Sequence, residues 1–336
     1  CIEPALDYIV AKVARFPFDK FATASNKLST QMKATGEVMS IGRTVEESLL
    51  KAIRSLEIGA YHLYLPKFDD FTTDELVSYI SDGHDDRMFA IAQLIRNNVD
   101  LGVIYNHTKI DMLFLYKFKN IIDFEKKLMA NPNNINVLYE AKRIGISDKY
   151  IAKVWGTDEL EIFRMRKENN VFPVYKMIDT CAGSISSDVP YLYSTYETEN
   201  ESIVSDKKKI IVLGSGPIRI GQGVEFDYST VHAIQTIKKS GYEAIIINNN
   251  PETVSTDYTT SDKLYFEPLT VEDVMNVITL EKPEGVIASL GGQTAINLAD
   301  KLDALGVELI GTGLQAIERA ENRDSFEKIM EELQIP

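Results

Sequence analysis

A short apolar segment that runs into a glycine-rich loop constrains the fold of this chain more than any other feature. Ile210 to Leu213 are four consecutive apolar residues, and glycines follow at positions 214, 216, 221 and 223. From about Ser229, apolar residues recur at helical spacing, with lysines on the opposite face. A brief apolar run bounded by glycine is typical of a buried strand in a parallel sheet. The stretch therefore predicts the strand, loop and helix of an α/β unit.

The glycine loop fits neither of the two common nucleotide-binding motifs. A dinucleotide fingerprint requires glycine where Arg219 stands, and a P-loop requires Gly-Lys-Ser/Thr after its spacer. Glycine at the exit of a strand lets the backbone turn sharply and approach a ligand or a neighbouring segment closely. The residues alone leave two interpretations open: a ligand-binding loop, or a tight turn between strand and helix.

The α/β rhythm continues to the end of the chain. Strands are predicted over 209–213, 243–248, 263–267, 285–290 and 307–310, and helices over 228–239, 271–281, 294–305, 314–321 and 323–333. Because the connections are short, we expect right-handed crossovers that build a three-layer parallel sheet.

Three of the predicted loops follow the carboxyl ends of strands: the glycine loop, residues 248–258 and residues 291–294. Sheets of this kind place their ligands beyond those ends. We expect the loops to converge on one edge of the sheet and to bring Glu225, Glu252, Gln293 and Thr294 close together. This pattern locates a site but does not identify a reaction.

The first half of the chain has a different character. Residues 1–44 are typical of strand and loop, and the chain is then nearly all helical to about residue 170. Thr44 with Glu47 and Thr72 with Glu75 predict two capping boxes. Further helices are predicted over 87–95, 111–128, 136–144, 148–154 and 159–168, with glycine caps at positions 145 and 156.

This helical block contains no cluster of catalytic residue types. His62, His84 and His107 lie in or near predicted loops without metal-ligand spacing, and we interpret them as solvated or capping histidines. An apolar stripe of Trp155, Phe163 and Met165 is interpreted as core. After residue 170 the helical pattern stops, and residues 186–207 are interpreted as a linker that crosses a surface.

Composition narrows the class of protein. A length of 336 residues predicts two or three domains. A formal net charge of −14 argues against nucleic acid and anionic membranes as partners. Two cysteines are too few for a disulfide scaffold, and no apolar run approaches the roughly 20 residues of a membrane span. We therefore expect a cytoplasmic protein. Because the chain lacks an initial Met and begins within a strand-like pattern, we interpret it as a fragment of a longer chain.

Several long motifs resemble the second synthetase half of the carbamoyl-phosphate synthase large subunit. They stand at 214–228, 250–258, 265–268 and 291–294, and upstream segments at 3–8, 31–44 and 193–196 resemble the same family. The resemblance implies a multi-domain α and α/β fold, with a helical oligomerisation domain followed by a Rossmann-like parallel-sheet pre-ATP-grasp domain. The implied boundaries are 1–30, the tail of the first ATP-grasp unit; 31–185, the oligomerisation domain; 186–207, a linker; 208–322, the pre-ATP-grasp domain; and 323–336, the start of the second ATP-grasp domain.

The resemblance also implies a function. The family uses bicarbonate, ammonia from glutamine and ATP to make carbamoyl phosphate, and unstable carbamate passes between the two halves through an interior passage. By similarity, Gly223 lies at that passage and Glu37, Glu225 and Glu252 line it. Such carboxylates could be ionised and repel carbamate, or protonated and hydrogen-bond it. A carboxylate at the start of a helix is also stabilised by the helix dipole, which is the alternative explanation of Glu225.

Gln293 and Thr294 are implied at the edge of the second, carbamate-phosphorylating site; their alternative role is to stabilise a turn through side-chain hydrogen bonds. ATP and Mg (or Mn) are implied for the full-length enzyme. The ATP-grasp residues that hold them lie outside this chain, so we expect no cofactor, no metal and no synthetase activity here. After Cys181 the chain has Ser184-Ile185 where the family often has Glu-Phe.

The implied partners are the rest of the large subunit, a glutaminase small subunit and a second copy bound through the helical domain. Arginine and pyrimidine synthesis both remain open as the pathway. A second hypothesis treats the chain as a non-catalytic self-association module, with helices over 45–168 and no ligand chemistry. A free-standing α/β nucleotide-binding protein is a third, which Arg219 disfavours.

Overall fold

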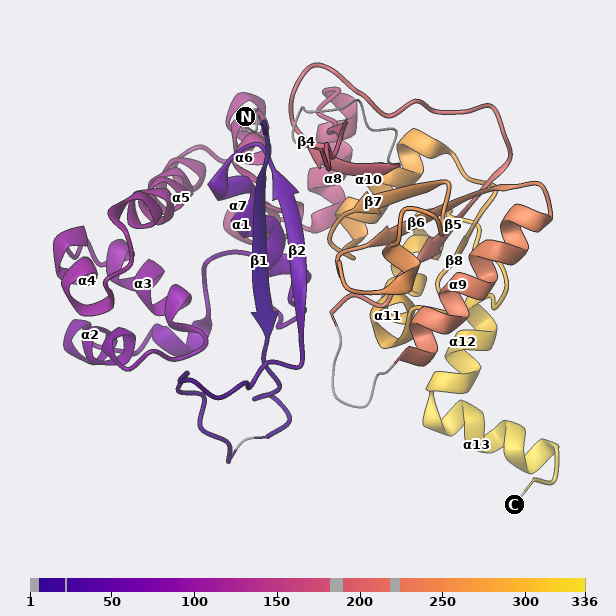
Figure 1. Cartoon of the computed structure of the whole chain (residues 1–336), viewed down its shortest axis with the longest axis horizontal. Helices are drawn as coiled ribbons and strands as arrows, with labels where there is room; N and C mark the ends of the chain where they lie inside the picture. The colour runs from indigo at the N-terminus through magenta and orange to yellow at the C-terminus, as the bar shows by residue number, and fades with distance from the viewer. Residues whose placement is uncertain (1–5, 22, 182–189, 218–223, 336) are drawn as a thin grey trace. The chain divides into compact units, whose positions relative to one another are not determined.

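The chain forms two compact units in a computed structural model (Figure 1). The structure describes residues 6–21, 23–181, 190–217 and 224–335. The first unit comprises Cys1–Ser187 and Tyr193–Glu201, and the second Asp188–Leu192 and Ser202–Pro336. One unit is mainly helical and the other is α/β, so the predicted α and α/β class is confirmed. The described residues contain no helix that is both long and apolar enough to cross a membrane.

The first unit begins with a two-stranded antiparallel ribbon of β1 (Ile9–Arg15) and β2 (Gly36–Gly42). Helix α1 (Val45–Ser55) packs against it, and Val38, Ala52 and Leu56 form a small core between them. The Thr44 side chain accepts a hydrogen bond from the Glu47 amide, as predicted. The Glu47 carboxylate, however, accepts from the Arg43 amide at 2.7 Å, so the reciprocal half of this predicted capping box is wrong.

The rest of the first unit is a group of short helices around one apolar core. The predicted capping box of Thr72 and Glu75 is confirmed, and Gly145 and Gly156 end two helices in the left-handed conformation, as predicted. A helix that the sequence pattern did not predict, α4, places His107 in its last turn. The elements are η1 (Pro66–Phe68), α2 (Thr73–Ser81), α3 (Arg87–Arg96), α4 (Leu101–Thr108), α5 (Met112–Ala130), α6 (Ile135–Ile144), α7 (Asp148–Trp155), α8 (Glu159–Glu168) and strand β3 (Val174–Met177).

The segment that the sequence predicts as a surface linker contributes to packing. Strand β4 (Tyr191–Thr195) lies within it. Tyr193 is fully buried in the first unit, and the Lys51 ammonium donates to the Ser194 hydroxyl at 2.9 Å. Tyr193 and Ser194 therefore complete the packing around α1, whereas most residues from 197 to 207 are exposed.

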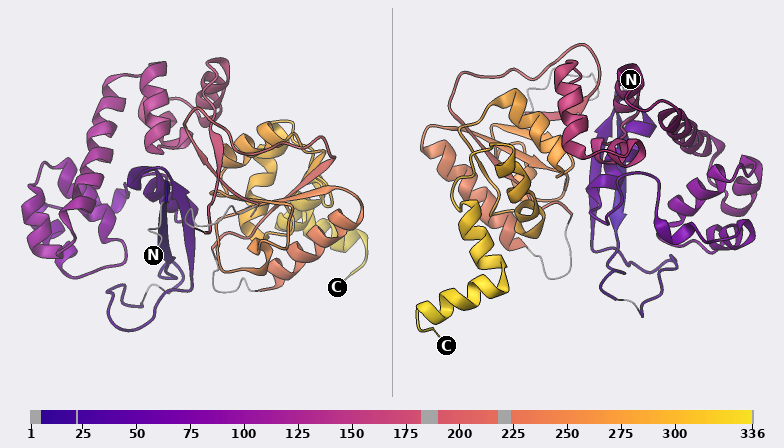
Figure 2. Two further views of the ribbon diagram at one scale, coloured as in Figure 1. Left: turned by 45° about the horizontal axis from the view of Figure 1, so that its top comes forward. Right: turned by 180° about the vertical axis from the view of Figure 1, so that it is seen from behind.

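The second unit is built on a parallel sheet. The strand order of the sheet is β3, β4, β7 (Lys263–Phe266), β6 (Glu243–Asn248), β5 (Lys209–Leu213) and β8 (Gly285–Ile287), and each neighbouring pair from β4 to β8 is parallel. Figure 2 shows helices on both sides of this sheet. They are α9 (Val224–Lys239), α10 (Val271–Glu281), α11 (Gly292–Ala304), α12 (Leu314–Glu321) and α13 (Arg323–Glu332), with the short η2 (Val254–Thr256).

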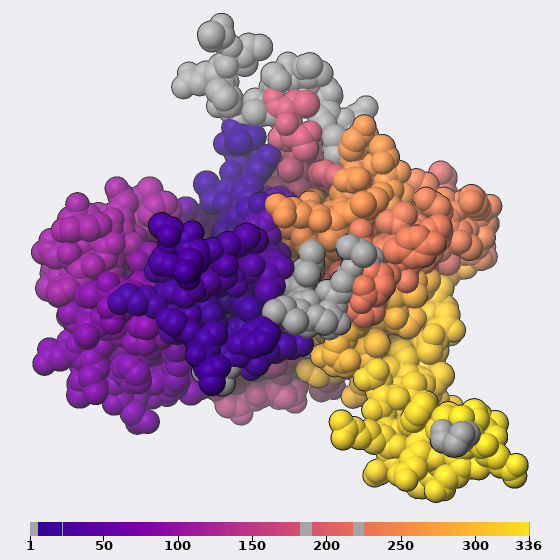
Figure 3. All heavy atoms as spheres, turned by 60° about the horizontal axis from the view of Figure 1, so that its bottom comes forward, coloured from indigo at the N-terminus to yellow at the C-terminus, as the bar shows by residue number. Residues whose placement is uncertain are grey.

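Most predicted elements of this unit are confirmed, with differences at their ends. The predicted strand over 307–310 is only an isolated bridge between Val286 and Leu309. Helix α9 begins at Val224, four residues before the predicted start. Helix α13 has no buried residue, and Figure 3 shows it in yellow standing clear of the rest of its unit.

Candidate functional site

The carboxyl edge of the parallel sheet brings the exits of β5 and β6 into direct contact. The Gly214 amide donates to the Ile247 carbonyl at 2.9 Å. A Cβ at position 214 would lie only 2.4 Å from the Asn248 side chain. Glycine is therefore needed here because the two loops approach too closely for any side chain.

Asn248 holds these two exits together. Its Oδ1 accepts hydrogen bonds from the Gly216 amide at 3.1 Å and the Asn249 amide at 2.9 Å. Asn248, Asn249 and Asn250 are all essentially buried. Within the described residues, the Nδ2 atoms of all three and the Oδ1 of Asn249 have no hydrogen-bond partner. Because buried polar groups are normally paired, this edge has a capacity for hydrogen bonds that the described protein groups leave unused.

The exit of β8 joins the same edge. A Cβ at Gly291 would lie 2.3 Å from the Gly214 carbonyl oxygen and 2.7 Å from that of Leu213. Gly292 has a positive φ of 61° and packs against the Phe226 ring, where a Cβ would come within 2.9 Å. The predicted convergence of the three loops is therefore found in the structure.

Asp227, in the first turn of α9, binds the loop over 248–258 to this helix. Its two carboxylate oxygens accept from the Val254 amide at 2.9 Å and the Ser255 amide at 3.0 Å. These amides open the short helix η2, whose first amides have no partner within their own turn. The start of α9 and the loop over 248–258 thus form one connected structure.

The predicted site residues occupy different parts of this edge. Glu225 lies exposed in the first turn of α9, as the helix-dipole alternative requires, and Glu252 is exposed in the second loop. Thr294 is buried in the first turn of α11. Gln293 is exposed beside it and donates to the Asn297 Oδ1 at 3.0 Å. The alternative of a turn is wrong for this pair, because both residues belong to a helix.

The two other predicted passage residues do not belong to the described part of the α/β unit. Gly223 lies outside the described residues. Glu37 belongs to the first unit, on strand β2, where its carboxylate pairs with the Lys12 ammonium at 2.5 Å. The sequence pattern missed Asp227 and the three asparagines. The asparagines had a signal, a run of polar residues directly after the apolar residues 244–247, whereas Asp227 had none.

A second polar cluster lies in the helical unit. His62 is 1% exposed, so its interpretation as a solvated histidine is wrong. Its Nε2 lies 3.0 Å from the Glu125 Oε2, and its ring stacks on Tyr150 with centroids 3.9 Å apart. Arg96 donates to both Glu125 oxygens, at 2.9 and 2.7 Å. No sequence pattern indicated this cluster, because His62, Arg96 and Glu125 lie far apart along the chain.

The charges of this cluster follow from its geometry. Burial alone would raise the pKa of Glu125, but the hydrogen bonds from Arg96 and His62 outweigh it and hold that pKa well below its ordinary value. Burial lowers the pKa of His62, more than its bond to Glu125 raises it. Glu125 is therefore a carboxylate and His62 a neutral imidazole at neutral pH.

Two of the other histidines, His84 and His107, have hydrogen-bond partners. The Nδ1 of His84 lies 2.9 Å from the Asn26 Oδ1, and that of His107 lies 3.0 Å from the Ser81 hydroxyl. Across the described ranges, no group of three His, Cys, Asp or Glu side chains could hold a metal ion.

A buried charge network in the α/β unit lies at the opposite, amino edge of the sheet. Glu281 is fully buried and pairs with Lys209 at 2.9 Å and Lys263 at 2.7 Å, the first residues of β5 and β7. Burial would raise the pKa of Glu281, but these two lysines and the Tyr265 hydroxyl lower it overall. Because each charge is paired, this network stabilises the starts of β5 and β7. It takes no part in the candidate site, which lies at the carboxyl edge.

Comparisons with known proteins match each unit. A family model described as the carbamoyl phosphate synthase pre-ATP-grasp domain matches residues 206–319. Another, described as the carbamoyl-phosphate synthetase large chain oligomerisation domain, matches residues 37–170.

A solved structure is also similar over part of the chain. It is the biotin carboxylase domain of a thermophilic 2-oxoglutarate carboxylase bound to ADP, with 19% identity and a TM-score of 0.28. The match covers 38% of this chain and 27% of that chain. At this TM-score the similarity does not establish a shared fold.

Proposed function

Because the chain belongs to the family of carbamoyl-phosphate synthase large subunits, we propose that it works as part of an ATP-dependent ligase. In this proposal the full-length subunit uses bicarbonate, ammonia released from glutamine, and ATP to make carbamoyl phosphate. The α/β unit contributes part of a carbamate passage and the edge of the second, carbamate-phosphorylating site. The helical unit contributes a surface for self-association.

One observation supports the site assignment more than any other. The loops after β5, β6 and β8 meet so closely that Gly214 and Gly291 leave no room for a Cβ. At the carboxyl edge of one sheet, these loops carry exposed carboxylates, a buried threonine and asparagine amides that have no partner among the described residues. This edge is where open parallel sheets bind ligands.

The passage residues in this proposal are Gly223, Glu225 and Glu252, with Glu37 from the helical unit. Carbamate is an anion that decomposes in water, so its transfer requires walls that neither admit bulk solvent nor hold the ion firmly. An ionised glutamate would repel the anion, whereas a protonated one would donate a hydrogen bond to it. Gln293 and Thr294 border the second site.

Substitutions at Glu225 in the full-length subunit test the passage. We expect Glu225→Ala to reduce overall synthesis while the two partial ATPase reactions continue. Glu225→Gln separates the two roles: it preserves synthesis if the residue donates a hydrogen bond, and it reduces synthesis if charge repulsion matters. A parallel fall of all three activities in both variants would instead mean that Glu225 is merely structural.

The chain alone is proposed to be inactive. Its residues include none of the ATP-grasp groups that would hold ATP and Mg (or Mn), so those cofactors belong to the full-length enzyme. Isothermal titration of the 336-residue chain with Mg-ATP is expected to give no micromolar binding, and such binding would overturn this part of the proposal.

Self-association is assigned to the surface of α4 and the start of α5 in the helical unit. Five large apolar side chains on α4 and the start of α5 are exposed: Val103 (40%), Tyr105 (39%), Leu113 (56%), Phe114 (48%) and Tyr116 (54%). Periodicity predicts Leu113, Phe114 and Tyr116 as part of the helix's apolar set, but its core-facing residues begin at Leu115 and resume at Ile121. Clustered exposed apolar side chains are typical of interfaces, and the matching family model is an oligomerisation domain.

We propose a second copy of the chain as the partner that covers this surface. Light scattering across a concentration series is expected to show a concentration-dependent increase in mass. A constant monomer mass would contradict this assignment. The non-catalytic module remains the alternative function, and it predicts self-association with no effect of Glu225 on the parent enzyme. A glutaminase small subunit as partner and a cytoplasmic location complete the proposal.

A further inference from the structure

Side chains on both sides of Glu252 hold its loop in place. The Asn250 Oδ1 accepts a hydrogen bond from the Glu252 amide at 3.0 Å. Further along the loop, the Asp227 carboxylate accepts from the Val254 amide at 2.9 Å and from the Ser255 amide at 3.0 Å. Glu252 therefore lies between two side-chain acceptors, and the path of the backbone at this residue depends on both.

The two hydrogen bonds of Asp227 require a carboxylate. One oxygen accepts from the Val254 amide and the other from the Ser255 amide. Hydrogen bonds to an ionised acceptor are roughly twice as strong as those between neutral groups. Asparagine has the same shape but a single acceptor oxygen, so it could keep one bond and would turn an NH₂ donor toward the other amide. The charge and the second oxygen of Asp227 are therefore both used on the loop.

The helix turn that carries Asp227 is itself fixed. The Phe226 ring packs against Gly292, where a Cβ would come within 2.9 Å of the ring. The Ser229 hydroxyl donates to the Glu225 carbonyl at 2.8 Å and spans the first turn of α9. Because this turn is held by its own packing and hydrogen bonds, Asp227 anchors the loop to a fixed support.

Glu225 and Glu252 lie on either side of this contact. Glu225 is two residues before Asp227 on α9, and Glu252 is two residues before Val254 in the loop. Two residues span at most about 7 Å, so the backbone of each glutamate stays within about that distance of one partner in the contact. The contact between Asp227 and Val254 therefore limits how far the two glutamates can move apart.

We propose that Asp227 is a positioning residue for the carbamate passage: its carboxylate holds the loop so that Glu252 stays close to Glu225. This inference rests on the proposed function, because the two glutamates are passage residues only within it. Asp227 acts through Glu252 and does not contact carbamate, since both of its oxygens are used by the loop amides. Without this anchor the loop moves, Glu252 no longer lines the passage, and carbamate escapes into water.

Hydrogen exchange in the intact chain tests the contact. We expect Asp227→Ala to speed exchange of the Val254 and Ser255 amides by about tenfold or more, which is the value of a lost hydrogen bond to a charged group. Asp227→Asn should speed exchange of one of these two amides. The β5 amides should change less, because the lost bonds lie in the loop. Unchanged loop amides would overturn the proposal, and so would equal changes in the loop and in β5, which indicate a purely stabilising role.

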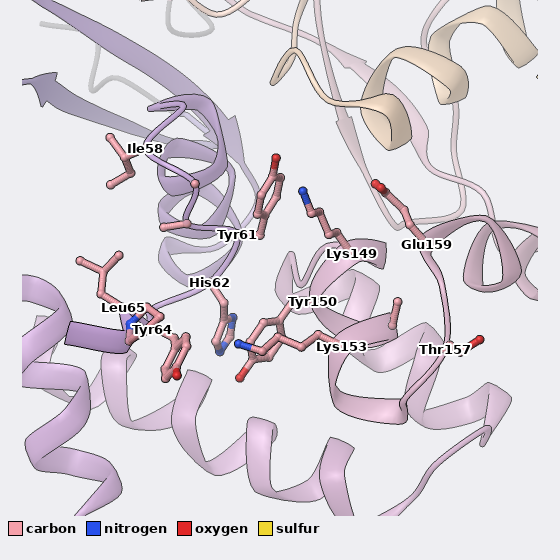
Figure 4. Close-up of a pocket in the computed structure, with 14 residues that line it drawn as sticks. Ile58, Tyr61, His62, Tyr64, Leu65, Lys149, Tyr150, Lys153, Thr157 and Glu159 are labelled. Atoms are coloured by element: carbon pink, nitrogen blue, oxygen red, sulfur yellow. The ribbon is translucent and has the colours of Figure 1, made fainter. Parts of the chain in front are cut away.

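Glu159 provides a matched control. It is also a carboxylate in the first turn of a helix, α8, and it lines a cavity of the helical unit (Figure 4). Because a carboxylate in this position interacts favourably with the helix dipole, Glu159→Gln should speed exchange of the α8 amides by no more than about fivefold. It should leave Val254 and Ser255 unchanged. If Asp227→Asn affected the α9 amides in the same way and spared Val254 and Ser255, the helix dipole would explain Asp227 and the proposal would be wrong.

ADP released per carbamoyl phosphate formed, measured in the full-length enzyme, tests the positioning role. We expect Glu252→Ala and Asp227→Ala each to raise this ratio, and the double variant to match Glu252→Ala, because residues that act through one another are not additive. A further rise in the double variant would overturn the inference.

The single variants distinguish this inference from the proposed function. If Glu252→Ala raises the ratio and Asp227→Ala does not, the positioning role is wrong and the proposed function stands. If Glu252→Ala leaves the ratio unchanged, Glu252 is not a passage residue, and that part of the proposed function fails together with the inference.

Discussion

Replacing Asp148 by asparagine should strongly destabilise the helical unit. Asp148 and Arg166 are both fully buried, and their side chains meet at 2.6 and 2.8 Å. Lys142, 2% exposed, lies 3.0 Å from the other carboxylate oxygen. The substitution removes the negative charge between two buried cations while keeping the shape of the side chain.

The size of the loss in stability depends on the hydrogen bonds that Lys142 and Arg166 each retain. Breaking a buried ion pair from one side typically costs about 3–5 kcal/mol. Lys142 keeps its bond to the Ile146 carbonyl at 2.7 Å, and Arg166 keeps its bonds to the Val171 carbonyl and the Tyr196 hydroxyl, both at 3.2 Å. We therefore expect a loss near the lower end, about 3 kcal/mol. With a urea m-value of about 2 kcal/mol/M, the unfolding midpoint should fall by about 1.5 M.

Trp155 provides the assay. It is the chain's only tryptophan and lies on α7, the helix that Asp148 begins. Its indole nitrogen donates to the Leu128 carbonyl at 3.0 Å, so its fluorescence responds to loss of helix packing. Urea unfolding followed at this residue reports on the helical unit, because the α/β unit contains no tryptophan.

Asp123→Asn is the matched control. Its carboxylate pairs with Lys119 on the exposed side of α5, with side chains 49% and 45% exposed. Exposed pairs of this kind contribute about 0.5 kcal/mol or less, so the midpoint should move by no more than about 0.3 M. If Asp148→Asn and Asp123→Asn shifted the midpoint equally, the reasoning from burial would be refuted.

Three further predictions concern other parts of the chain. Folding lowers the pKa of Glu125, so its contribution to stability is present above the unfolded pKa of about 4.3 and is lost as the pH falls below that value. The difference in unfolding free energy between wild type and Glu125→Gln should therefore shrink in acid. A constant difference in Trp155 unfolding curves from pH 7 to 3 would contradict this. Gly291→Ala should destabilise the α/β unit by about 1–3 kcal/mol or more, since its Cβ would meet a backbone oxygen at 2.3 Å. Gly313→Ala enters open space and loses only the preference for glycine at the N-cap of α12, so it should cost about 0.5 kcal/mol. Hydrogen exchange of the β5 amides measures both variants, and equal effects would contradict the close contact. Phe114→Lys should abolish self-association in light scattering while leaving the urea midpoint unchanged, and an unchanged mass distribution would move the interface elsewhere.

Local sequence pattern predicted the α/β unit well because its signals are local. Strands β5 and β6 begin and end at the predicted residues, since each is an apolar run that is buried on both faces. Gly145 and Gly156 were predictable as caps because their left-handed backbone favours glycine. The meeting of three loops followed from the topology of a parallel sheet and needed no knowledge of side chains.

Other features depend on contacts between distant residues and could not be predicted in this way. His62 was interpreted as a loop histidine, but it is buried beside Glu125 and Arg96, which belong to other helices. Asp227 stood just before the predicted helix over 228–239, and no sequence pattern indicated that its carboxylate accepts from the amides of η2. Helical spacing placed Phe114 among core residues, but spacing alone cannot say which turns of a helix are covered.

The most direct test of the proposed function is the coupling ratio of the full-length enzyme, measured as ADP released per carbamoyl phosphate formed. If the carboxyl-edge loops border a carbamate passage, Glu225→Ala lets the intermediate escape, and the ratio rises above the wild-type value while bicarbonate-dependent ATP hydrolysis continues. A ratio equal to that of the wild type, with every activity reduced in proportion, would contradict the account.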